Sequence, residues 1–331
     1  MKITTVDTHT EGQATRIVVA GLPEVGGDSM AEKRRELRAR YDHLRRGLLA
    51  EPRGHAGMLG CVLVEPCDAT ADFGAIFWHN NGYLDVSGQA AMGVITALLE
   101  TGIIDPDDGS ASIALDTPAG VVHIEAALDG GRASSVIFRN VPSWVGLQGA
   151  SLHVPERGEV IVDVAYGGNL CVTAWAEHLD VELAPHDLDA VTRAAMAVLE
   201  AARDKLIIRN PETGERHEIT AVTVLDAPHN EPPALRGMQV YGPGSFDRAP
   251  DVAGAGARMA VMLARGEILP EQAVLVESAI TSGVFHARVT DSERTGVRTT
   301  VSTEVIGRAF VTGLHDFVFD AEDPFNGGFL I

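Results

Sequence analysis

The chain has 331 residues, of which 45% are hydrophobic, and its formal net charge is −20 at pH 7. This length and apolar content predict a folded protein of about two domains rather than a disordered chain. The acidic balance argues against nucleic acid or an anionic membrane surface as a partner. With no long apolar run and no basic, apolar leader, we expect a soluble cytoplasmic protein.

The first part of the chain combines short strands with one charged helix. Strands are predicted over Lys2–Val6 and Thr15–Ala20, on either side of a polar turn. His9 and Glu11 in this turn are candidate catalytic side chains, although hydrogen bonding within the turn is the commoner role. Interleaved acidic and basic residues over Ser29–Leu49 predict an amphipathic helix with a solvated face.

The rest of the chain is dominated by short strands. A further helix is predicted over Leu188–Lys205. The predicted strands lie over Cys61–Val64, Phe73–Trp78, Ala111–Leu115, Val121–Ala127, Ser134–Arg139, Trp144–Val145, Val160–Ala165, Thr220–Leu225, Met238–Val240, Gln272–Ser278, Val284–Val289, Thr299–Val305 and Ala309–Val318. Many short strands with one dominant apolar helix in each half favour an α+β fold over alternating βαβ units.

Those two apolar helices are built alike. One begins at Ser87 and the other at Asp251, and each runs from a small-residue first turn to a glycine stop, at Gly102 and Gly266. Both are apolar nearly all round, so each should be buried in its own domain. A helix N-terminus carries about half a positive charge and unpaired N–H groups, so each helix start could also bind an anion. The repeat spacing places a domain boundary near residues 145–150.

Nothing in the sequence requires a metal or a cofactor. The three cysteines, Cys61, Cys67 and Cys171, have no zinc-like spacing, and we expect buried free thiols. The 12 histidines show no paired-ligand pattern. The segment 254–256 faintly resembles a dinucleotide fingerprint, but no apolar strand precedes it.

The two helix starts together suggest a reaction. If both point into one interdomain cleft, their N–H groups can bind a carboxylate from two sides and stabilise the charge of an enolate. Ser87 and Asp251 would then lie on opposite faces of an α-carbon, as racemisation requires. Asp251 is a weak base unless desolvation raises its pKa, because the helix dipole lowers it, and Ser87 is weaker still. The alternative is that both residues only cap their helices.

Taken together, motifs along the whole chain resemble the proline racemase family, which includes hydroxyproline epimerases and 3-hydroxyproline dehydratases. These motifs are Asp7-Thr8-His9-Thr10, Glu51-Pro52-Arg53-Gly54-His55, Asn81-Gly82-Tyr83, Thr117-Pro118-Ala119-Gly120, Asn140-Val141-Pro142-Ser143, Tyr166-Gly167-Gly168-Asn169, Asp247-Arg248-x-Pro250, Ala257-Arg258-Met259-Ala260 and Asp323-Pro324-Phe325 with Gly328-Phe329. The resemblance implies a diaminopimelate epimerase-like fold: two pseudo-symmetric domains, each a sheet wrapped around a central helix, with a cofactor-independent site in the cleft. We expect a first domain over residues 1–147, joined by the C-terminal segment 314–331, and a second over 148–313.

The departures from the family pattern fall at its two catalytic cysteines. Ser87 and Asp251 stand at those positions, which marks an atypical member. The resemblance assigns Asp247 to the substrate amine. It assigns contacts around the substrate carboxylate to Gly88, Gln89, Val252 and Ala253. Gln89 replaces a histidine, so it can donate a hydrogen bond but cannot carry positive charge.

Three functions follow from these residues. The first is an isomerase, a cofactor-independent racemase or epimerase of proline-like amino acids that works by two-base α-proton transfer. The second is a lyase, a 3-hydroxyproline-type dehydratase, which suits a site with one good base. The third is a catalytically degenerate protein that binds an amino acid without turnover. The expected partner is a small amino or imino acid, with a homodimer as the candidate assembly and neither nucleic acid nor a membrane as a partner.

Overall fold

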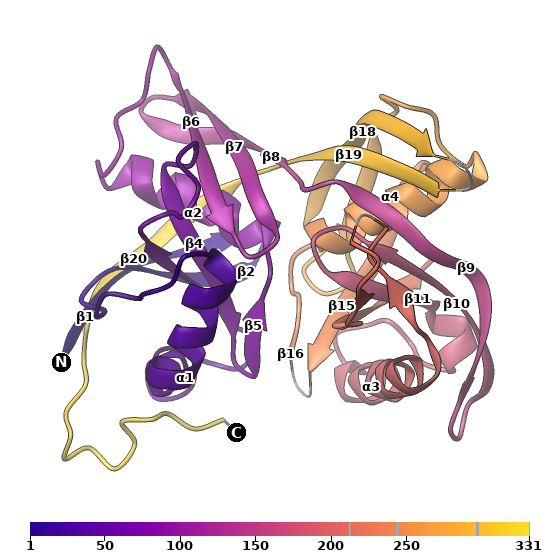
Figure 1. Ribbon diagram of the computed structural model, residues 1–331, viewed down its shortest axis with the longest axis horizontal. Coiled ribbons are helices and arrows are strands. Elements are labelled where there is room, and N and C mark those ends of the chain that lie inside the picture. Colours follow the sequence, from indigo (N-terminus) through magenta and orange to yellow (C-terminus); the bar gives the residue numbers. More distant parts are fainter. Residues whose placement is uncertain (212, 243–244, 296–297, 331) are drawn as a thin grey trace. The chain divides into compact units, whose positions relative to one another are not determined.

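The structure is a computed structural model that describes residues 1–211, 213–242, 245–295 and 298–330 (Figure 1). By contacts between Cα atoms the chain divides into two compact units. Unit 1 consists of Met1–Arg139 and Ile306–Ile331, and unit 2 of Asn140–Val305. The expected domain bounds, 1–147 with 314–331 and 148–313, stay a prediction, and residue 331 lies outside the described part of the chain.

Unit 1 contains two α-helices and nine strands among its described residues. The helices are α1 (Met30–Leu49) and α2 (Gly88–Glu100). The strands are β1 (Lys2–Thr10), β2 (Gln13–Ala20), β3 (Leu59–Val64), β4 (Phe73–His79), β5 (Gly82–Leu84), β6 (Ser110–Thr117), β7 (Gly120–Asp129), β8 (Arg132–Arg139) and β20 (Ala309–Val318).

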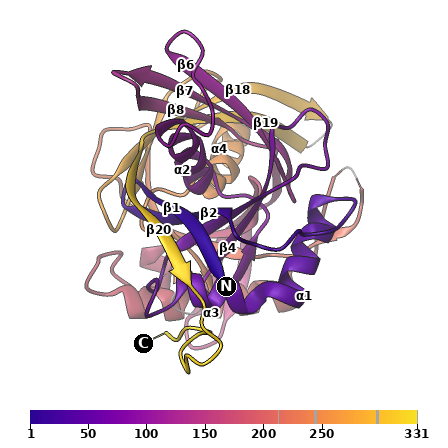
Figure 2. The same cartoon turned by 90° about the vertical axis from the view of Figure 1, so that its left-hand side faces the viewer.

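The sheet of unit 1 joins both ends of the chain. Strand β1 pairs antiparallel with β2 on one side and with the C-terminal strand β20 on the other, and Figure 2 shows β1 and β20 side by side. Parallel pairings link β2 to β3 and β4 to β6, and β6, β7 and β8 form an antiparallel meander. Helix α2 contacts β1, β2, β7, β8 and β20, and all its residues from Gly88 to Leu99 are buried.

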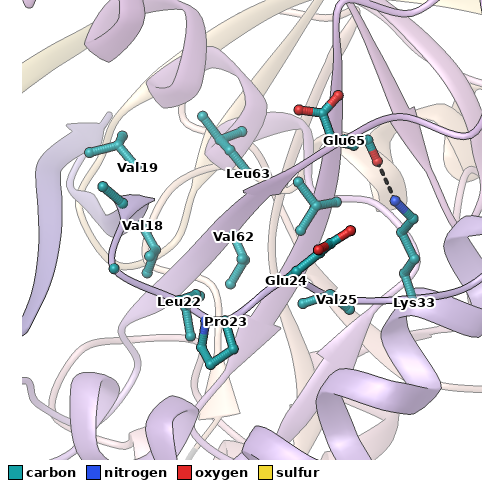
Figure 3. Close-up of a pocket in the computed structure, with 13 residues that line it drawn as sticks. Val18, Val19, Leu22, Pro23, Glu24, Val25, Lys33, Val62, Leu63 and Glu65 are labelled. Carbon is teal, nitrogen blue, oxygen red and sulfur yellow. Dashed lines mark hydrogen bonds between the residues drawn. The ribbon is translucent and has the colours of Figure 1, made fainter. Parts of the chain in front are cut away.

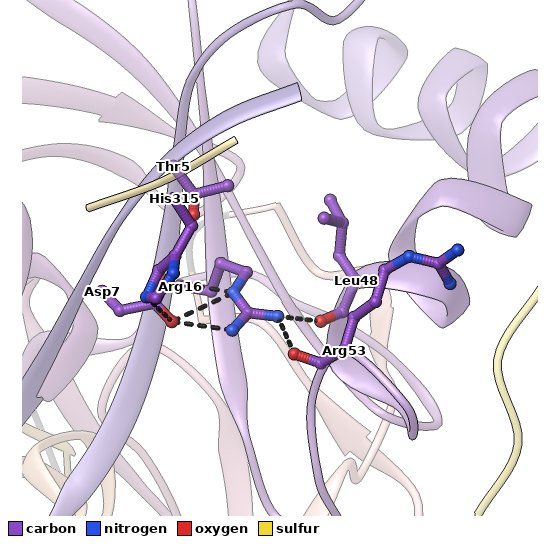
Figure 4. A network of polar contacts seen from close by, with 6 residues as sticks. All are labelled: Thr5, Asp7, Arg16, Leu48, Arg53 and His315. Atoms are coloured by element: carbon purple, nitrogen blue, oxygen red, sulfur yellow. Dashed lines mark hydrogen bonds and ion pairs between the residues drawn. The ribbon is translucent and has the colours of Figure 1, made fainter. Parts of the chain in front are cut away.

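A buried ion pair anchors the start of this sheet. Asp7 on β1 accepts hydrogen bonds from the guanidinium of Arg16 on β2, and the same guanidinium donates to the carbonyl oxygens of Leu48 and Arg53 (Figure 4). The Arg16 Nη2–Asp7 Oδ2 distance is 2.7 Å, and His315 of β20 lies 3.6 Å from the same carboxylate oxygen. Polar residues with such partners stay buried in a strand, so the predicted turn over 7–12 is wrong. The turn is only Glu11-Gly12, with φ angles of 47° and 91°.

Unit 2 contains two α-helices, a 3-10 helix and eleven strands among its described residues. The helices are η1 (Ala176–Leu179), α3 (Leu188–Lys205) and α4 (Val252–Arg265). The strands are β9 (Ser143–Val154), β10 (Gly158–Tyr166), β11 (Leu170–Trp175), β12 (Ile208–Arg209), β13 (Arg216–His217), β14 (Ala221–Asp226), β15 (Ala234–Gly242), β16 (Ser245–Phe246), β17 (Val274–Ser278), β18 (Val284–Thr295) and β19 (Arg298–Gly307, which extends beyond the unit's last residue).

Each of the two α-helices of unit 2 packs against the central strands. Antiparallel pairing joins β9, β10 and β11, parallel pairing joins β11 to β14, and β15 lies antiparallel to β14. Val172, Val222 and Val240 belong to one apolar cluster with α3. Because strand side chains alternate between faces, the intervening residues project from the other face. There Ala165 packs on Ala257 of α4.

The strand-rich architecture with few helices agrees with the prediction. Helix α3 matches its predicted bounds, and α1 begins one residue after the predicted start because Ser29 is its N-cap. Strand β9 is much longer than the predicted Trp144–Val145, and β11 was not predicted at all. No helix among the residues that the structure describes is long and apolar enough to span a lipid bilayer. The pseudo-symmetry of the two halves and a cleft between them stay predictions.

Candidate active site

Asp251 caps helix α4 with a buried carboxylate. Its Oδ2 accepts a hydrogen bond of 2.6 Å from the backbone N–H of Gly254. The amide Nε2 of Gln239, on strand β15, donates to the same oxygen. Only 9% of Asp251 is exposed to solvent. The helix start is therefore closed by a carboxyl group that two donors hold in place.

Gly254 is required by this arrangement. A Cβ atom at this position would lie 1.9 Å from Asp251 Oδ2 and 2.9 Å from Thr223 Oγ1. Such distances are far inside van der Waals contact, and both neighbours are themselves buried. The absence of a side chain in the first turn thus gives the carboxylate its place over the helix N–H groups.

Burial dominates the acidity of Asp251. Desolvation raises the pKa of its carboxyl from 3.8 to about 7, while the backbone N–H groups of Gly254 and Ala253 act in the lowering direction. Withdrawal from water disfavours the charged carboxylate more than the helix start favours it. A carboxyl group with this pKa exchanges its proton near neutral pH, as a general acid or base must.

Asp247 lies in the same loop, just before α4. It is 3% exposed, and its backbone N–H donates to the carbonyl oxygen of Gln239 at 2.9 Å. Its carboxylate forms a side-chain hydrogen bond with Tyr241, and burial and this partner raise the pKa of the phenol. The hydroxyl groups of Ser278 and Thr281 both donate to the carbonyl oxygen of Arg248. Strand β15 and the β17–β18 connection thus hold the loop that carries both carboxylates.

The sheet face beneath α4 is polar close to Asp251. Thr223 on β14 is paired in register with Gln239 on β15, so their side chains share this face. The buried Thr223 Oγ1 has no hydrogen-bond partner among the described residues. Cys171 on β11 is also buried here; desolvation, followed by the charge of Asp251, raises the pKa of its thiol. The thiol is thus kept in its neutral form.

Two further glycines bring neighbouring segments against α4. A Cβ on Gly167 would lie 2.2 Å from the carbonyl oxygen of Ala253, and one on Gly256 would lie 2.8 Å from both Asn140 Nδ2 and Ser143 Oγ. Asn140 Nδ2 also donates to the Gly167 carbonyl oxygen at 2.8 Å. The glycines and the Asn140 amide therefore serve to close-pack the helix start.

The start of α2 in unit 1 has the same design with weaker groups. Ser87 Oγ accepts from the N–H of Ala90 at 3.4 Å, and Ser87 is 3% exposed. Thr10 Oγ1 on β1 donates to the carbonyl oxygen of Gln89 at 2.8 Å. A Cβ on Gly93 would lie 2.4 Å from Thr8 Oγ1. The 7–10 segment thus packs against α2 through backbone and hydroxyl contacts.

The two helices also end in the same way. In α2 the N–H groups of Gly102 and Ile103 donate to the carbonyl oxygens of Leu99 and Leu98. In α4 the N–H groups of Gly266 and Glu267 donate to those of Leu263 and Met262. Both glycines have positive φ, 70° and 73°, which is the Schellman ending. One constant offset of 164 residues maps Ser87 onto Asp251 and Gly102 onto Gly266.

Comparison with known proteins extends this picture to the whole chain. The family model described as proline racemase matches residues 5–330. The chain belongs to the proline racemase family. Proline racemase from Clostridioides difficile is 32% identical over 329 residues, which cover 99% of this chain and 98% of the relative. Trans-3-hydroxy-L-proline dehydratase from Bacillus thuringiensis is 33% identical, with the same coverage.

A solved structure shows the same fold. A hydroxyproline epimerase from Agrobacterium vitis, crystallised with bound trans-4-hydroxy-L-proline, superposes with a TM-score of 0.90 at 27% identity. The match covers 100% of this chain and 96% of that one. The family membership predicted from the sequence motifs is therefore confirmed.

The structure brings the predicted site residues together in two groups. Ser87, Gly88 and Gln89 form the start of α2 in unit 1. The start of α4 in unit 2 holds Asp251, Val252 and Ala253, with Asp247 in the loop before it. His9 of the family's first motif stacks on Phe310 with ring centroids 5.3 Å apart, and its Nδ1 accepts from the Gly12 N–H. These contacts support a structural role for His9.

Sequence reasoning missed the side chains that surround Asp251. Gln239, Thr223 and Cys171 come from three strands, one of them unpredicted. A signal was present at Gln239, a polar residue between the apolar Met238 and Val240. The expectation of buried thiols is correct for Cys61 and Cys171 but wrong for Cys67, which is exposed in the loop after β3.

One cavity of unit 1 contains none of the predicted site residues. It has a volume of about 200 Å³ and lies at the end of β2, between Val18, Leu22 and Val62 (Figure 3). Lys33 Nζ, on its rim, donates to the Glu65 carbonyl oxygen at 2.7 Å. The cavity therefore lies apart from the helix starts that carry the predicted site residues.

Proposed function

We propose that this chain is a cofactor-independent racemase or epimerase of a proline-like amino acid, with Asp251 and Ser87 as the two proton-handling groups. The observation that carries the proposal is the Asp251 carboxyl, buried at the start of α4 with a pKa raised to about 7. The family relatives act on proline and hydroxyprolines by their names. Asp251 stands where the resemblance expects a catalytic group.

The proposed chemistry needs both helix starts at one substrate. The proposal requires that the two units are pseudo-symmetric domains and that their helix starts face opposite sides of the α-carbon in a cleft. In one direction the Asp251 carboxylate removes the α-proton and the Ser87 hydroxyl returns a proton to the opposite face. The N–H groups at both helix starts hold the substrate carboxylate and stabilise the enolate charge that develops on it.

Substrate orientation follows from the neighbouring residues. Asp247 receives the secondary ammonium group of a proline-like ring, because a buried carboxylate favours a cationic partner. The substrate carboxylate lies against the starts formed by Gly88 and Gln89 and by Val252 and Ala253. Gln89 contributes a hydrogen-bond donor without charge. No resident cofactor takes part in this scheme.

Dehydration of a 3-hydroxylated imino acid is the second candidate. The asymmetry of the two caps favours it, since Asp251 is an effective base near neutral pH whereas the Ser87 hydroxyl has no neighbour shown to take its proton. In that reaction Asp251 removes the α-proton, the C3 hydroxyl leaves as water after protonation, and the enamine product tautomerises to a cyclic imine. The dehydratase from Bacillus thuringiensis, at 33% identity, is consistent with this reaction in the family.

One experiment separates these candidates. The protein is incubated in deuterated water with the enantiomers of proline and the isomers of 3- and 4-hydroxyproline, and NMR follows the α-proton. Deuterium incorporation with inversion at the α-carbon is the expected result. A cyclic imine from a 3-hydroxy substrate would assign dehydration instead. Binding without exchange across the panel would overturn both enzymatic proposals in favour of an amino-acid-binding protein.

A further inference from the structure

We propose that Gln239 is a positioning residue for Asp251, because its amide and the backbone N–H of Gly254 both donate to Oδ2 and so fix the orientation of the carboxyl group. This inference rests on the proposed function of Asp251 as a base. Gln239 is 2% exposed and lies on β15, outside the loop and helix that carry the predicted catalytic group.

The geometry at the carboxylate carries the first step. Gln239 Nε2 and the N–H of Gly254 both donate to Oδ2 of Asp251. An oxygen that accepts from two N–H donors cannot take up a proton without breaking one of those bonds. The backbone N–H of Ala253 is a further donor to this carboxyl group. Two fixed donors on one oxygen also set the plane of the carboxyl group.

Main-chain contacts carry the second step. The carbonyl oxygen of Gln239 accepts from the backbone N–H of Asp247, while its side chain donates to Asp251. One residue thus holds the group proposed for the substrate amine and the group proposed for the α-proton. Gln239 is paired with Thr223 on β14, and β15 is also joined to β17 through residues 234–237, so a paired strand supports this residue.

The neighbours of Gln239 restrict it to this orientation. Its side chain also hydrogen-bonds the thiol of Cys171 on β11, whose neutral form burial favours. Thr223 lies directly beside it on β14. The charged or titratable groups packed around Asp251 are Cys171, Asp247, Arg248, Tyr241, Arg258 and Glu277. Glu277 accepts hydrogen bonds from the backbone N–H groups of His229 and Asn230. Gln239 donates to Asp251 from its side chain.

The test is a titration that needs no substrate. Protein labelled with ¹³C at the Asp carboxyl is titrated by NMR, and the Asp251 signal is identified by its absence from Asp251→Asn. Gln239→Met keeps the side-chain volume but removes the donor, and Gln239→Asn keeps the amide but withdraws it by one methylene. Loss of a donor to the charged form should raise the pKa of Asp251 by about one unit in both variants.

A turnover measurement gives the second readout. On the substrate found in the deuterium experiment, both variants should lose about 10- to 100-fold in kcat with little change in KM, because the carboxyl is misplaced rather than absent. Gln272→Met is the matched control, since Gln272 bonds at a distant turn of the same unit. It should leave the titration and kcat as in the wild type.

A wild-type Asp251 titration in a folded Gln239→Met or Gln239→Asn protein would overturn the inference. Lower thermal stability with an unchanged titration would do the same, since it would assign Gln239 to packing alone. Because the titration involves no turnover, failure of the proposed function would leave its result readable.

Discussion

The starts of α2 and α4 have similar backbone arrangements but different capping side chains. Each start is buried, and its capping side chain accepts a hydrogen bond from the backbone N–H three residues later. Each helix ends at a glycine with positive φ. Ser87 accepts one bond of 3.4 Å, whereas Asp251 accepts two donors on one oxygen and is desolvated enough to titrate near neutral pH. A repeated helix start therefore fixes the position of the capping group, whereas the strands beneath it set the burial and the hydrogen bonding that control its pKa.

The largest effect is expected from removing the proton-handling group of α4. Asparagine is as good an N-cap as aspartate, so Asp251→Asn should keep the fold but lower α-proton exchange by several orders of magnitude. Ser87→Ala is the matched change at α2. It should abolish inversion while leaving exchange of the enantiomer that faces Asp251. Full exchange by Asp251→Asn, measured by deuterium incorporation, would reduce Asp251 to a cap.

The pH dependence should follow the α4 start alone. A base acts when ionised, so kcat/KM for deprotonation by Asp251 should rise about tenfold per pH unit until pH reaches the pKa of about 7. The stability effect has the opposite direction. A carboxyl whose pKa is raised from 3.8 on folding contributes stability below pH 3.8 that is lost as pH rises through about 7. Urea unfolding of the wild type between pH 4 and 8 should show this loss, and Asp251→Asn should lack it.

Gly254→Ala should disturb α4 through contact rather than charge. The new Cβ would meet Asp251 Oδ2 at 1.9 Å, so either the cap or the first turn must shift. We expect the free energy of unfolding to fall by about 1–3 kcal/mol and exchange activity to fall with it. Wild-type stability and activity, measured by denaturant unfolding and deuterium exchange, would show that the carboxylate has another position available.

The smallest effect should be equal in the two units. Gly102 and Gly266 both have positive φ, and no atom of the described residues lies within 4 Å of a Cβ at either position. Alanine at each should therefore cost about 1 kcal/mol through backbone strain alone. Thermal unfolding of the two single variants would test this. A clearly unequal loss would break the equivalence of the helix ends.

The sequence predicts this frame better than it predicts the site. Both helix starts, both glycine stops and most strands follow from capping residues and alternating hydrophobicity, which are local signals. Strand β11 is not predicted because it is a short buried run, apolar except for Thr173, that directly follows a glycine-rich turn. The raised pKa of Asp251 cannot be predicted from the sequence for a different reason. The effect of the helix dipole can be inferred from local sequence, whereas desolvation by β11, β14 and β15 depends on contacts between distant segments. Gln239 could be recognised as polar within a strand, but not as a partner of Asp251.

The pairing of β20 with β1 has a consequence for how the chain is made. Strand β1 is synthesised long before its partner β20, with which it pairs from Lys2–Val318 to Thr10–Ala309. Unit 2, by contrast, is one continuous segment. During synthesis unit 2 can fold while the sheet of unit 1 still has an unpaired edge at β1. An unpaired strand edge favours aggregation. The sheet of unit 1 is therefore completed only when β20 has been made, and the unit that carries Asp251 can fold before the unit that carries Ser87.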